Sequence, residues 1–312
     1  MSFLYWLESS RTPFLDTLMS LITHIGEETV FLVIALLMFW CVEKRRGYTF
    51  LLVGFVGICV NQLLKLIFRI PRPWVKDPTF RPVDSAIAEA SGYSFPSGHT
   101  QNAIDTFGCI ARGTRRRALQ IVCAVIIVLV SFSRMYLGVH TPLDVGVSLG
   151  TGLILVFGLY PVIYRATEKP SYMWITLSLM TLASVALLLY TQCFPSPADV
   201  DAENLLSGQK NAYTMLGCSL AMLVVYAIDC RFLHFKTGAP LPGQAIKLIL
   251  GAAIAFALKT LLKAPLEALL DGHMIARAIR YFIIVLFAGV VWPLTFPWWT
   301  RLGSRPNTTR TK

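Results

Sequence analysis

The chain has 312 residues, of which 55% are hydrophobic and only 14% are charged, and its formal net charge is +11. Soluble domains carry about 25% charged residues, so this composition excludes an ordinary water-soluble protein and indicates an integral membrane protein. The basic residues form short clusters between apolar segments instead of one patch with interleaved aromatics, so we expect no nucleic-acid partner.

The first 27 residues alternate between apolar and polar character. Phe14, Leu18, Leu21 and Ile25 recur at spacings of three and four, while charged residues fall between them. This period predicts an amphipathic helix over residues 1–27, too polar to span a membrane and suited to its interface.

Apolar segments fill most of the remaining chain. A helix of about 20 apolar residues crosses a bilayer core of about 30 Å, and no polar stretch is long enough to build a separate soluble domain. The sequence therefore predicts an all-α, polytopic transmembrane helical bundle of about nine spans. The predicted spans are residues 28–42, 47–68, 96–112, 118–134, 142–164, 171–192, 211–228, 244–262 and 278–298.

The loops between these spans alternate in charge. Basic clusters follow every second span, for example Lys44–Arg46 and Arg115–Arg117, and the C-terminal tail is also basic. Cytoplasmic loops are enriched in Lys and Arg, so we expect these clusters inside and the N-terminus outside. The loops 69–95, 135–141, 193–210 and 263–277 then face outward.

The loop 69–95 breaks this rule, because four of its residues are basic. They are Arg69, Arg72, Lys76 and Arg81. They are either ordinary loop charges or cations that this loop holds because it binds an anion.

A first motif consists of Lys65, Arg72 and Pro73. Lys65 precedes Arg72 by about two helical turns, so both can face one side if the helix continues to Ile70. A lysine at the end of an apolar span is costly without a partner, although it can also extend its ammonium group to the interface. The arginine suits bidentate contact with phosphate oxygens.

A second motif, Pro96-Ser97-Gly98-His99, is typical of a helix start. Pro96 is favoured at the first helical position, so Ser97, Gly98 and His99 would present free backbone N–H groups to an anion. The alternative is a plain capped helix with a surface histidine.

A third motif contains Ser133, Arg134, His140 and Asp144. The segment Thr141-Pro142-Leu143-Asp144 predicts a capping box, with Thr141 as N-cap and Asp144 reaching back to it. Asp144 also lies one turn from His140, where a carboxylate would fix the tautomer of the imidazole. Both interpretations need the same helix start.

Together the motifs supply three cations, one helix N-terminus, two histidines and one carboxylate. This set suits phosphoryl transfer through a covalent histidine. His140 would attack phosphorus, and His99 would protonate the leaving oxygen and then activate water. Lys65, Arg72, Ser97, Gly98 and Arg134 would hold the phosphate oxygens. The sequence has no cluster with metal-ligand spacing, so we expect no metal and no cofactor.

These motifs resemble the three signature motifs of the type 2 phosphatidic acid phosphatase superfamily, and the match covers residues 28–192. The resemblance implies a metal-independent phosphatase with a six-helix core. It also implies His140 as nucleophile, Asp144 as its partner and His99 as general acid. Lys65, Arg72, Ser97, Gly98 and Arg134 then correspond to the phosphate site. We expect three regions: an interfacial helix (1–27), a phosphatase core (28–192) and a C-terminal transmembrane extension (193–312).

The substrate stays open at this stage. A site at the outer interface favours a lipid phosphate or diphosphate, such as undecaprenyl pyrophosphate, phosphatidic acid or phosphatidylglycerophosphate, and makes membrane lipids the expected partners. A nine-span layout is similar to that of the glucose-6-phosphatases, which act on a soluble phosphate ester. A phospholipid transporter that binds without cleaving is the alternative outside enzymes. We expect a multi-pass protein of a bacterial cell membrane with its active site outside; the sequence does not indicate an oligomeric state.

Polar side chains inside the apolar segments have two interpretations. Asp105 lies mid-span and is either functional or a packed, hydrogen-bonded or protonated core group. In the extension, Lys259, Lys263, Arg277 and Arg280 are candidates for holding headgroups at the outer face. The seven cysteines form no C-x-x-C pair, and we expect them to act as small buried hydrophobes.

Overall fold

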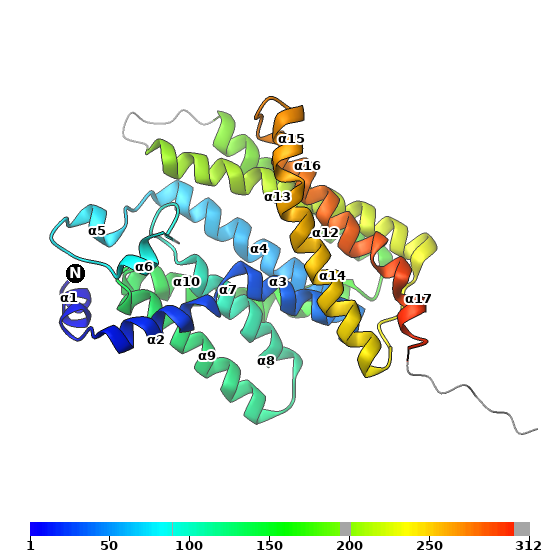
Figure 1. Ribbon diagram of the computed structural model, residues 1–312, viewed down its shortest axis with the longest axis horizontal. Helices are drawn as coiled ribbons and strands as arrows, with labels where there is room; N and C mark the ends of the chain where they lie inside the picture. Colours follow the sequence, from blue (N-terminus) through cyan, green and yellow to red (C-terminus); the bar gives the residue numbers. More distant parts are fainter. Residues whose placement is uncertain (89, 194–200, 303–312) are drawn as a thin grey trace, which may run out of the picture.

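The computed structural model describes residues 1–88, 90–193 and 201–302, and the regular structure in these ranges is helical, without strands. The predicted all-α bundle is therefore confirmed (Figure 1), and each of the nine predicted spans is mostly helical, with Pro96, Ser97, Leu262 and Trp292 as the residues outside helix. Asp199 and the basic tail residues Arg305, Arg310 and Lys312 lie outside the described residues.

The N-terminal region and the core contain twelve α-helices, several of which continue into a π-helical segment. They are α1 (Ser2–Ser9), α2 (Pro13–His24), α3 (Glu28–Leu37) with η1 (Met38–Val42), α4 (Lys44–Phe68), α5 (Pro73–Lys76), α6 (Asp84–Ile87), α7 (Gly98–Ala103) with η2 (Ile104–Gly108) and α8 (Cys109–Gly113), α9 (Arg117–Tyr136), α10 (Pro142–Ile154) with η3 (Leu155–Leu159) and α11 (Tyr160–Ala166), and α12 (Pro170–Cys193).

The C-terminal extension adds three long helical segments and shorter turns. They are α13 (Ala202–Ile228) with η4 (Asp229–Leu233), α14 (Leu241–Leu261), α15 (Lys263–Leu269), and α16 (Ile275–Leu286) with η5 (Phe287–Val291), η6 (Pro293–Thr295) and α17 (Phe296–Trp299).

Length and composition separate these helices into two groups. Among the described residues, seven helices are long and apolar enough to cross a membrane, and an eighth results if the bent pair α2 and α3 counts as one span. The predicted spans 28–42 and 96–112 are the short ones, since their helices cover only residues 28–42 and 98–113. The helices of these two short spans contact each other, and α7 also packs against α4, α9 and α10.

The N-terminal segment differs from the single helix predicted over residues 1–27. Two helices form, because Thr12 caps a new helix by accepting a hydrogen bond from the Leu15 N–H, and Pro13 occupies its first position. The second of these helices, α2, meets α3 at an angle of 43°. The buried Thr23 and Gly26 lie at this bend, against the core.

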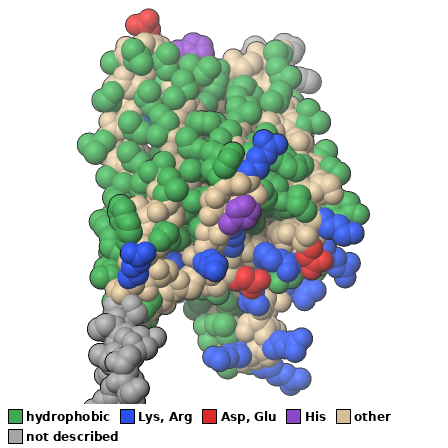
Figure 2. Space-filling view, turned by 90° about the vertical axis from the view of Figure 1, so that its right-hand side faces the viewer, with side chains coloured by type: hydrophobic (Ala, Val, Ile, Leu, Met, Phe, Trp, Pro, Cys, Tyr) green, Lys and Arg blue, Asp and Glu red, His purple; other side chains and the backbone are tan. Residues whose placement is uncertain are grey.

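The two ends of the bundle differ in character. One end carries α1, α5 and α6, and the opposite end carries α17 and the connection between η4 and α14 (Figure 1). Figure 2 looks onto that opposite end, where Lys and Arg side chains gather along the lower part of the face and hydrophobic side chains cover the upper part. This distribution agrees with the charge alternation of the loops.

The extension packs firmly against the core at this basic end. The Trp40 indole N–H donates to the Ala288 carbonyl at 2.9 Å, joining η1 to η5. Lys44 at the start of α4 lies 2.9 and 3.0 Å from the two carboxylate oxygens of Asp229, and the Tyr48 hydroxyl donates to the same carboxylate at 3.3 Å. Asp229 is buried, so these donors compensate its lost hydration.

We expect Lys44→Met to destabilise the protein, because it leaves the buried Asp229 carboxylate with the Tyr48 hydroxyl as its remaining donor. The free energy of unfolding should fall by roughly 2 kcal/mol, the scale of a hydrogen bond to a charged group. Thermal unfolding in detergent measures this change.

Two variants control the experiment. Arg45→Met breaks an exposed ion pair with Glu168 and removes hydrogen bonds to the Thr167 hydroxyl and the Tyr164 carbonyl, but it leaves no buried charge unpaired and should lower stability less than Lys44→Met. Adding Asp229→Asn to Lys44→Met should recover part of the loss. Equal losses for Lys44→Met and Arg45→Met would contradict a structural role for the buried pair.

Candidate active site

The first motif lies at the end of α4 and in the loop after it. Lys65 occupies the last turn of α4 and is buried, with its ammonium group donating to the Tyr93 carbonyl. The helix ends at Phe68, where the predicted span 47–68 also ends, and it does not continue to Ile70 because Arg69 adopts a left-handed conformation with φ of 51°. Arg72 therefore lies outside the helix, and the chain turns it back toward Lys65.

Arg72 is buried and uses its whole guanidinium group. It donates from Nε to the Gly92 carbonyl at 3.1 Å, from Nη2 to the Ser91 carbonyl at 2.8 Å and from Nη1 to the Val139 carbonyl at 3.0 Å. These bonds fix the loop before the second motif to the loop of the third motif. Loop folding, rather than a shared helix face, thus brings Lys65 and Arg72 together.

The second motif begins a helix, but the helix starts two residues later than predicted. Helix α7 starts at Gly98 with Ser97 as N-cap, and the Ser97 side chain accepts from the Thr100 N–H, so Pro96 precedes the helix and does not open it. The predicted free N–H of Ser97 is also wrong, because it donates to the Asp144 carbonyl at 3.2 Å. The first helical residues, Gly98 and His99, are half-buried.

The third motif confirms its predicted capping box. Thr141 caps α10 by accepting from the Asp144 N–H, while Asp144 Oδ2 accepts from the Thr141 N–H at 2.7 Å. The same oxygen lies 3.5 Å from His140 Nδ1 and accepts from the Ser94 hydroxyl at 2.6 Å. Asp144 and His140 are each 1% exposed, so these contacts form inside the protein.

The hydrogen bonds of His140 indicate its tautomer. Arg72 Nη1 lies 3.0 Å from His140 Nε2, and a guanidinium can only donate, so Nε2 accepts and the ring hydrogen lies on Nδ1, toward Asp144. Burial lowers the pKa of His140 well below its ordinary value, and the nearby charges of Arg72 and Arg134 lower this pKa further. The ring is therefore neutral, with the Nε2 lone pair directed at the cations.

Arg134 and His99 complete the group. Arg134 is fully buried at the end of α9, where its carbonyl accepts from the Val139 and His140 N–H groups and its Nη1 donates to the Thr23 hydroxyl at 2.7 Å. His99 Nε2 is buried and has no hydrogen-bond partner among the described residues. The charge of His99 is among those that act on His140, so the two imidazoles share one electrostatic environment.

The structure thus brings all eight predicted site residues into one region, where six are buried and Gly98 and His99 are half-buried. They are Lys65, Arg72, Ser97, Gly98, His99, Arg134, His140 and Asp144. Of the four loop cations, Arg72 is fixed in this region by its hydrogen bonds to His140 and Val139. Arg69 donates to the Leu66 carbonyl of its own helix, and Lys76 and Arg81 are exposed. The excess positive charge of loop 69–95 is therefore only partly explained by an anion site.

Two side chains that contact these residues are not evident from the motifs. Ser94 donates to Asp144, and Thr23 of α2 accepts from Arg134. Ser94 lies directly before the second motif and could have been suspected from its position. Thr23 could not, because it comes from a helix more than 100 residues away in sequence, which only tertiary packing places on α9.

Other buried polar groups lie apart from this region. Asp105 accepts two hydrogen bonds from the Gln101 amide at 3.0 and 3.1 Å, and Gln101 in turn accepts from Thr151 at 2.7 Å. This supports the interpretation of Asp105 as a packed, hydrogen-bonded core group. Across the described ranges, no group of three or more His, Cys, Asp or Glu side chains could hold a metal ion.

Comparison with known proteins places this geometry in a family. Residues 46–168 match the PAP2 superfamily, and residues 213–304 match the transmembrane extension of PAP2 superfamily phosphatases. The chain is 32% identical over 160 residues to phosphatidylglycerophosphatase B of Bacillus subtilis, covering 47% of this chain and 74% of that protein. The chain belongs to the PAP2 superfamily. It is a phosphatase and an integral membrane protein.

Two further relatives in this family have names that specify another lipid substrate. The undecaprenyl-diphosphatase BcrC of Bacillus subtilis is 30% identical over 151 residues, covering 48% of this chain and 75% of its own length. The undecaprenyl-diphosphatase of Sulfolobus acidocaldarius is 31% identical over 137 residues, covering 42% of this chain and 62% of its own length. No solved structure matches the chain.

We expect Ser94→Ala to lower kcat roughly 10-fold, because Asp144 loses its shortest hydrogen bond and orients His140 less well. Phosphate release from a lipid phosphate in detergent measures the rate. Ser131→Ala is a matched control, since it deletes a buried hydroxyl that has no hydrogen-bond partner in the described structure. A Ser94→Ala enzyme with the kcat of Ser131→Ala would show that this bond is dispensable.

Proposed function

We propose that this PAP2 phosphatase hydrolyses a lipid phosphate or diphosphate at the outer face of a bacterial cell membrane through a phosphohistidine intermediate. The single observation that carries the proposal is the buried His140, whose Nδ1 lies 3.5 Å from the Asp144 carboxylate and whose Nε2 faces the Arg72 guanidinium. Such an arrangement leaves a nucleophilic lone pair where a phosphate would be bound.

In the first step, His140 Nε2 forms a bond to phosphorus as the bond from phosphorus to the leaving oxygen breaks. His99 gives its proton to that oxygen. In the second step His99 takes a proton from water, the resulting hydroxide attacks phosphorus, and the phosphorus–nitrogen bond breaks to release inorganic phosphate. Asp144, whose Oδ2 lies 3.5 Å from His140 Nδ1, stabilises the charge on the ring while the phosphorus–nitrogen bond exists.

The buried cations supply the charge stabilisation. Lys65, Arg72 and Arg134 currently donate to backbone carbonyls or hydroxyls, which are weaker partners than phosphate oxygens. A phosphate entering beside Gly98 would exchange these bonds for charge-assisted ones. Because the cations are already desolvated, their attraction to a transition-state charge exceeds what they would provide in water.

The outer location follows from the charge of the loops. The site residues come from the end of α4, the start of α7, the end of α9 and the start of α10, whereas the basic clusters Lys44–Arg46 and Arg115–Arg117 lie at the opposite ends of α4 and α9. By the positive-inside rule this arrangement supports a site that faces outward. A lipid headgroup arrives there by lateral diffusion. The names of the relatives, a phosphatidylglycerophosphatase and undecaprenyl-diphosphatases, support a lipid substrate.

We expect a ³²P-labelled lipid phosphate, mixed with the purified protein in EDTA and quenched in alkali, to leave label on His140. His140→Asn should lose the label and lower kcat by about 10³-fold or more, because the nucleophile is gone. Peptide mass spectrometry identifies the labelled residue. His273→Asn, at an exposed position, is the control. Turnover without any labelled histidine, or turnover abolished by EDTA, would contradict the mechanism.

The pH dependence follows from the lowered pKa of His140. The ring must be neutral to attack, so protonation of His140 should lower kcat/KM only below pH 6.5, the ordinary pKa of histidine. We therefore expect kcat/KM to persist at pH 6. Arg72→Gln removes one cause of the shift and should move this decrease toward higher pH. The folded protein disfavours the protonated ring, so the contribution of His140 to the free energy of unfolding is complete above pH 6.5 and decreases as the pH falls below that value.

Two alternatives remain as outcomes of a substrate panel. Hydrolysis of glucose 6-phosphate but of no lipid phosphate would indicate an enzyme for a soluble ester. A His140→Asn protein that retained full biological activity would instead favour a transporter that binds phospholipid without cleaving it.

A further inference from the structure

Two adjoining cavities separate the core from the C-terminal extension. The larger, of about 160 Å³, is almost wholly apolar and lies between α3 and α4 of the core and α13, α14 and α16 of the extension. The smaller, of about 90 Å³, is polar. Both are lined by Glu28, Ile58, Thr214, Met215 and Tyr281, so they meet at one end.

The polar cavity reaches the candidate active site. Gly98 lines it, and so does Asn61, which lies one helical turn before Lys65 on α4. A methyl group placed on Gly98 would lie 3.9 Å from Asn61 Oδ1. A phosphate held beside Gly98 would therefore have its ester oxygen next to this cavity.

Asn61 is the strongest indication of a ligand. It is 3% exposed, yet neither its amide nitrogen nor its amide oxygen has a hydrogen-bond partner in the described structure. A buried amide without partners costs about 1–3 kcal/mol, so it is expected where a bound group supplies the missing bonds. Asn61 offers that group both a donor and an acceptor.

The remaining polar lining comes from both parts of the chain. Gln62 and Asn102 belong to the core, and Asn211 and Arg277 belong to the extension. Arg277 is held in place by donating from Nε to the Thr214 hydroxyl at 2.7 Å. With Glu28 opposite in charge, the lining carries no net charge, which suits esters and hydroxyls better than a second phosphate.

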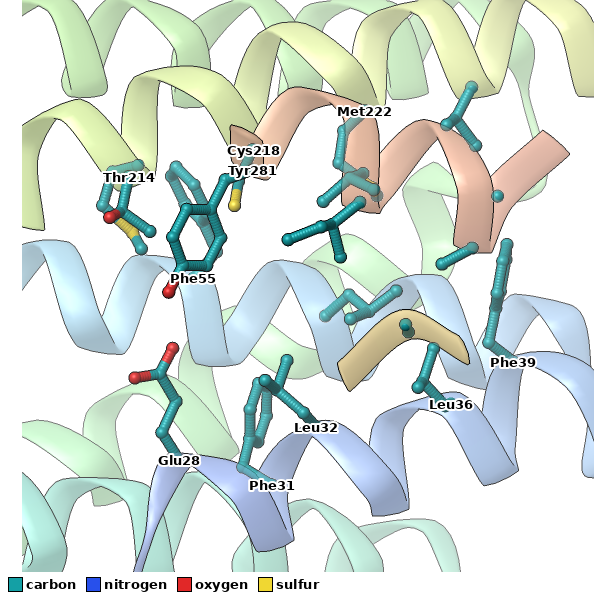
Figure 3. A pocket seen from close by; sticks show the side chains of 18 of the residues that line it. Glu28, Phe31, Leu32, Leu36, Phe39, Phe55, Thr214, Cys218, Met222 and Tyr281 are labelled. Atoms are coloured by element: carbon teal, nitrogen blue, oxygen red, sulfur yellow. The ribbon is translucent and has the colours of Figure 1, made fainter. Parts of the chain in front are cut away.

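The apolar cavity continues away from the site along α3. In Figure 3, the oxygen atoms of Glu28 and Tyr281 point toward each other at one end, and Phe31, Leu36 and Phe39 follow toward the other. Its size is close to that of an engineered apolar cavity of about 150 Å³ that stays dry and binds benzene. Such a space accepts a length of hydrocarbon and excludes water.

We propose that the C-terminal extension completes the substrate pocket. The apolar cavity takes the first part of a hydrocarbon chain, and the polar cavity takes the uncharged linker between chain and phosphate, with Asn61 as its hydrogen-bond partner. This inference rests on the proposed function, and it narrows the substrate to lipid phosphate monoesters with an ester- or hydroxyl-bearing linker. Residues of the extension thereby determine specificity.

The experiment uses the full-length protein and compares kcat/KM for long-chain and dihexanoyl phosphatidic acid. Ala255 on α14 is buried and lines the apolar cavity, whereas Ala257 on the same helix is exposed. In the series Ala255→Val, Ala255→Leu and Ala255→Phe, the ratio of long-chain to short-chain kcat/KM should fall progressively, by 10-fold or more for Phe. Ala257→Phe should keep the wild-type ratio.

The graded series keeps the test decisive if the largest substitution does not fold. An unchanged ratio through Ala255→Val and Ala255→Leu would overturn the pocket while leaving the proposed lipid phosphatase intact. A wild-type enzyme that hydrolysed neither phosphatidic acid nor undecaprenyl diphosphate would overturn the proposed function itself. A preference for undecaprenyl diphosphate over long-chain phosphatidic acid would overturn the uncharged linker.

Asn61→Leu tests the polar part by two readouts. Activity on long-chain phosphatidic acid should fall at least 10-fold in kcat/KM through a higher KM, while the melting temperature stays at or above the wild-type value. A structural asparagine would show the opposite pattern, with lower stability and unchanged KM. Ser131→Ala, which also deletes an unpartnered buried polar group, should leave KM unchanged.

Discussion

The geometry of the site depends on the contacts that the buried Asp144 carboxylate makes. Its Oδ2 accepts from the Thr141 N–H and the Ser94 hydroxyl and lies beside His140 Nδ1, while its backbone carbonyl accepts from the Ser97 N–H. One residue thus caps α10, holds the imidazole and ties the second motif to the third. Because a buried carboxylate without donors is unstable, the fold can form only when these segments are correctly placed.

Buried cations are the second constraint. Lys65, Arg72 and Arg134 lie within one region, and the Asp144 carboxylate is the charge that opposes them there. Backbone carbonyls satisfy their hydrogen bonds but not their charge, so the region attracts an anion. The same cations lower the pKa of His140 and keep its lone pair available. Anion binding and nucleophile activation therefore have one physical origin in this proposed site.

The C-terminal extension both packs against the core and lines cavities beside it. Its helices meet the core through Trp40 and the Lys44–Asp229 pair at the basic end, and from this contact toward the candidate site they leave two adjoining cavities. A packed contact at the basic end, with cavities between this contact and the candidate site, suits a set of helices that forms one wall of a ligand site. Its family match to a PAP2 transmembrane extension agrees with a role tied to the phosphatase core.

The sequence by itself determined the helical class, the positions of seven of the nine predicted spans, the capping box of α10 and the residues of the three motifs. Each of these depends on local periodicity or on residues a few positions apart. The sequence placed the start of α7 at Pro96, because the Ser97–Asp144 hydrogen bond joins segments distant in sequence. It treated residues 1–27 as one helix, because their apolar period was given more weight than the helix start at Thr12 and Pro13. Only the tertiary structure decided that Thr23 contacts Arg134, that Asn61 faces a cavity and that the extension lines it, because these contacts join helices distant in sequence, whose packing no local pattern encodes.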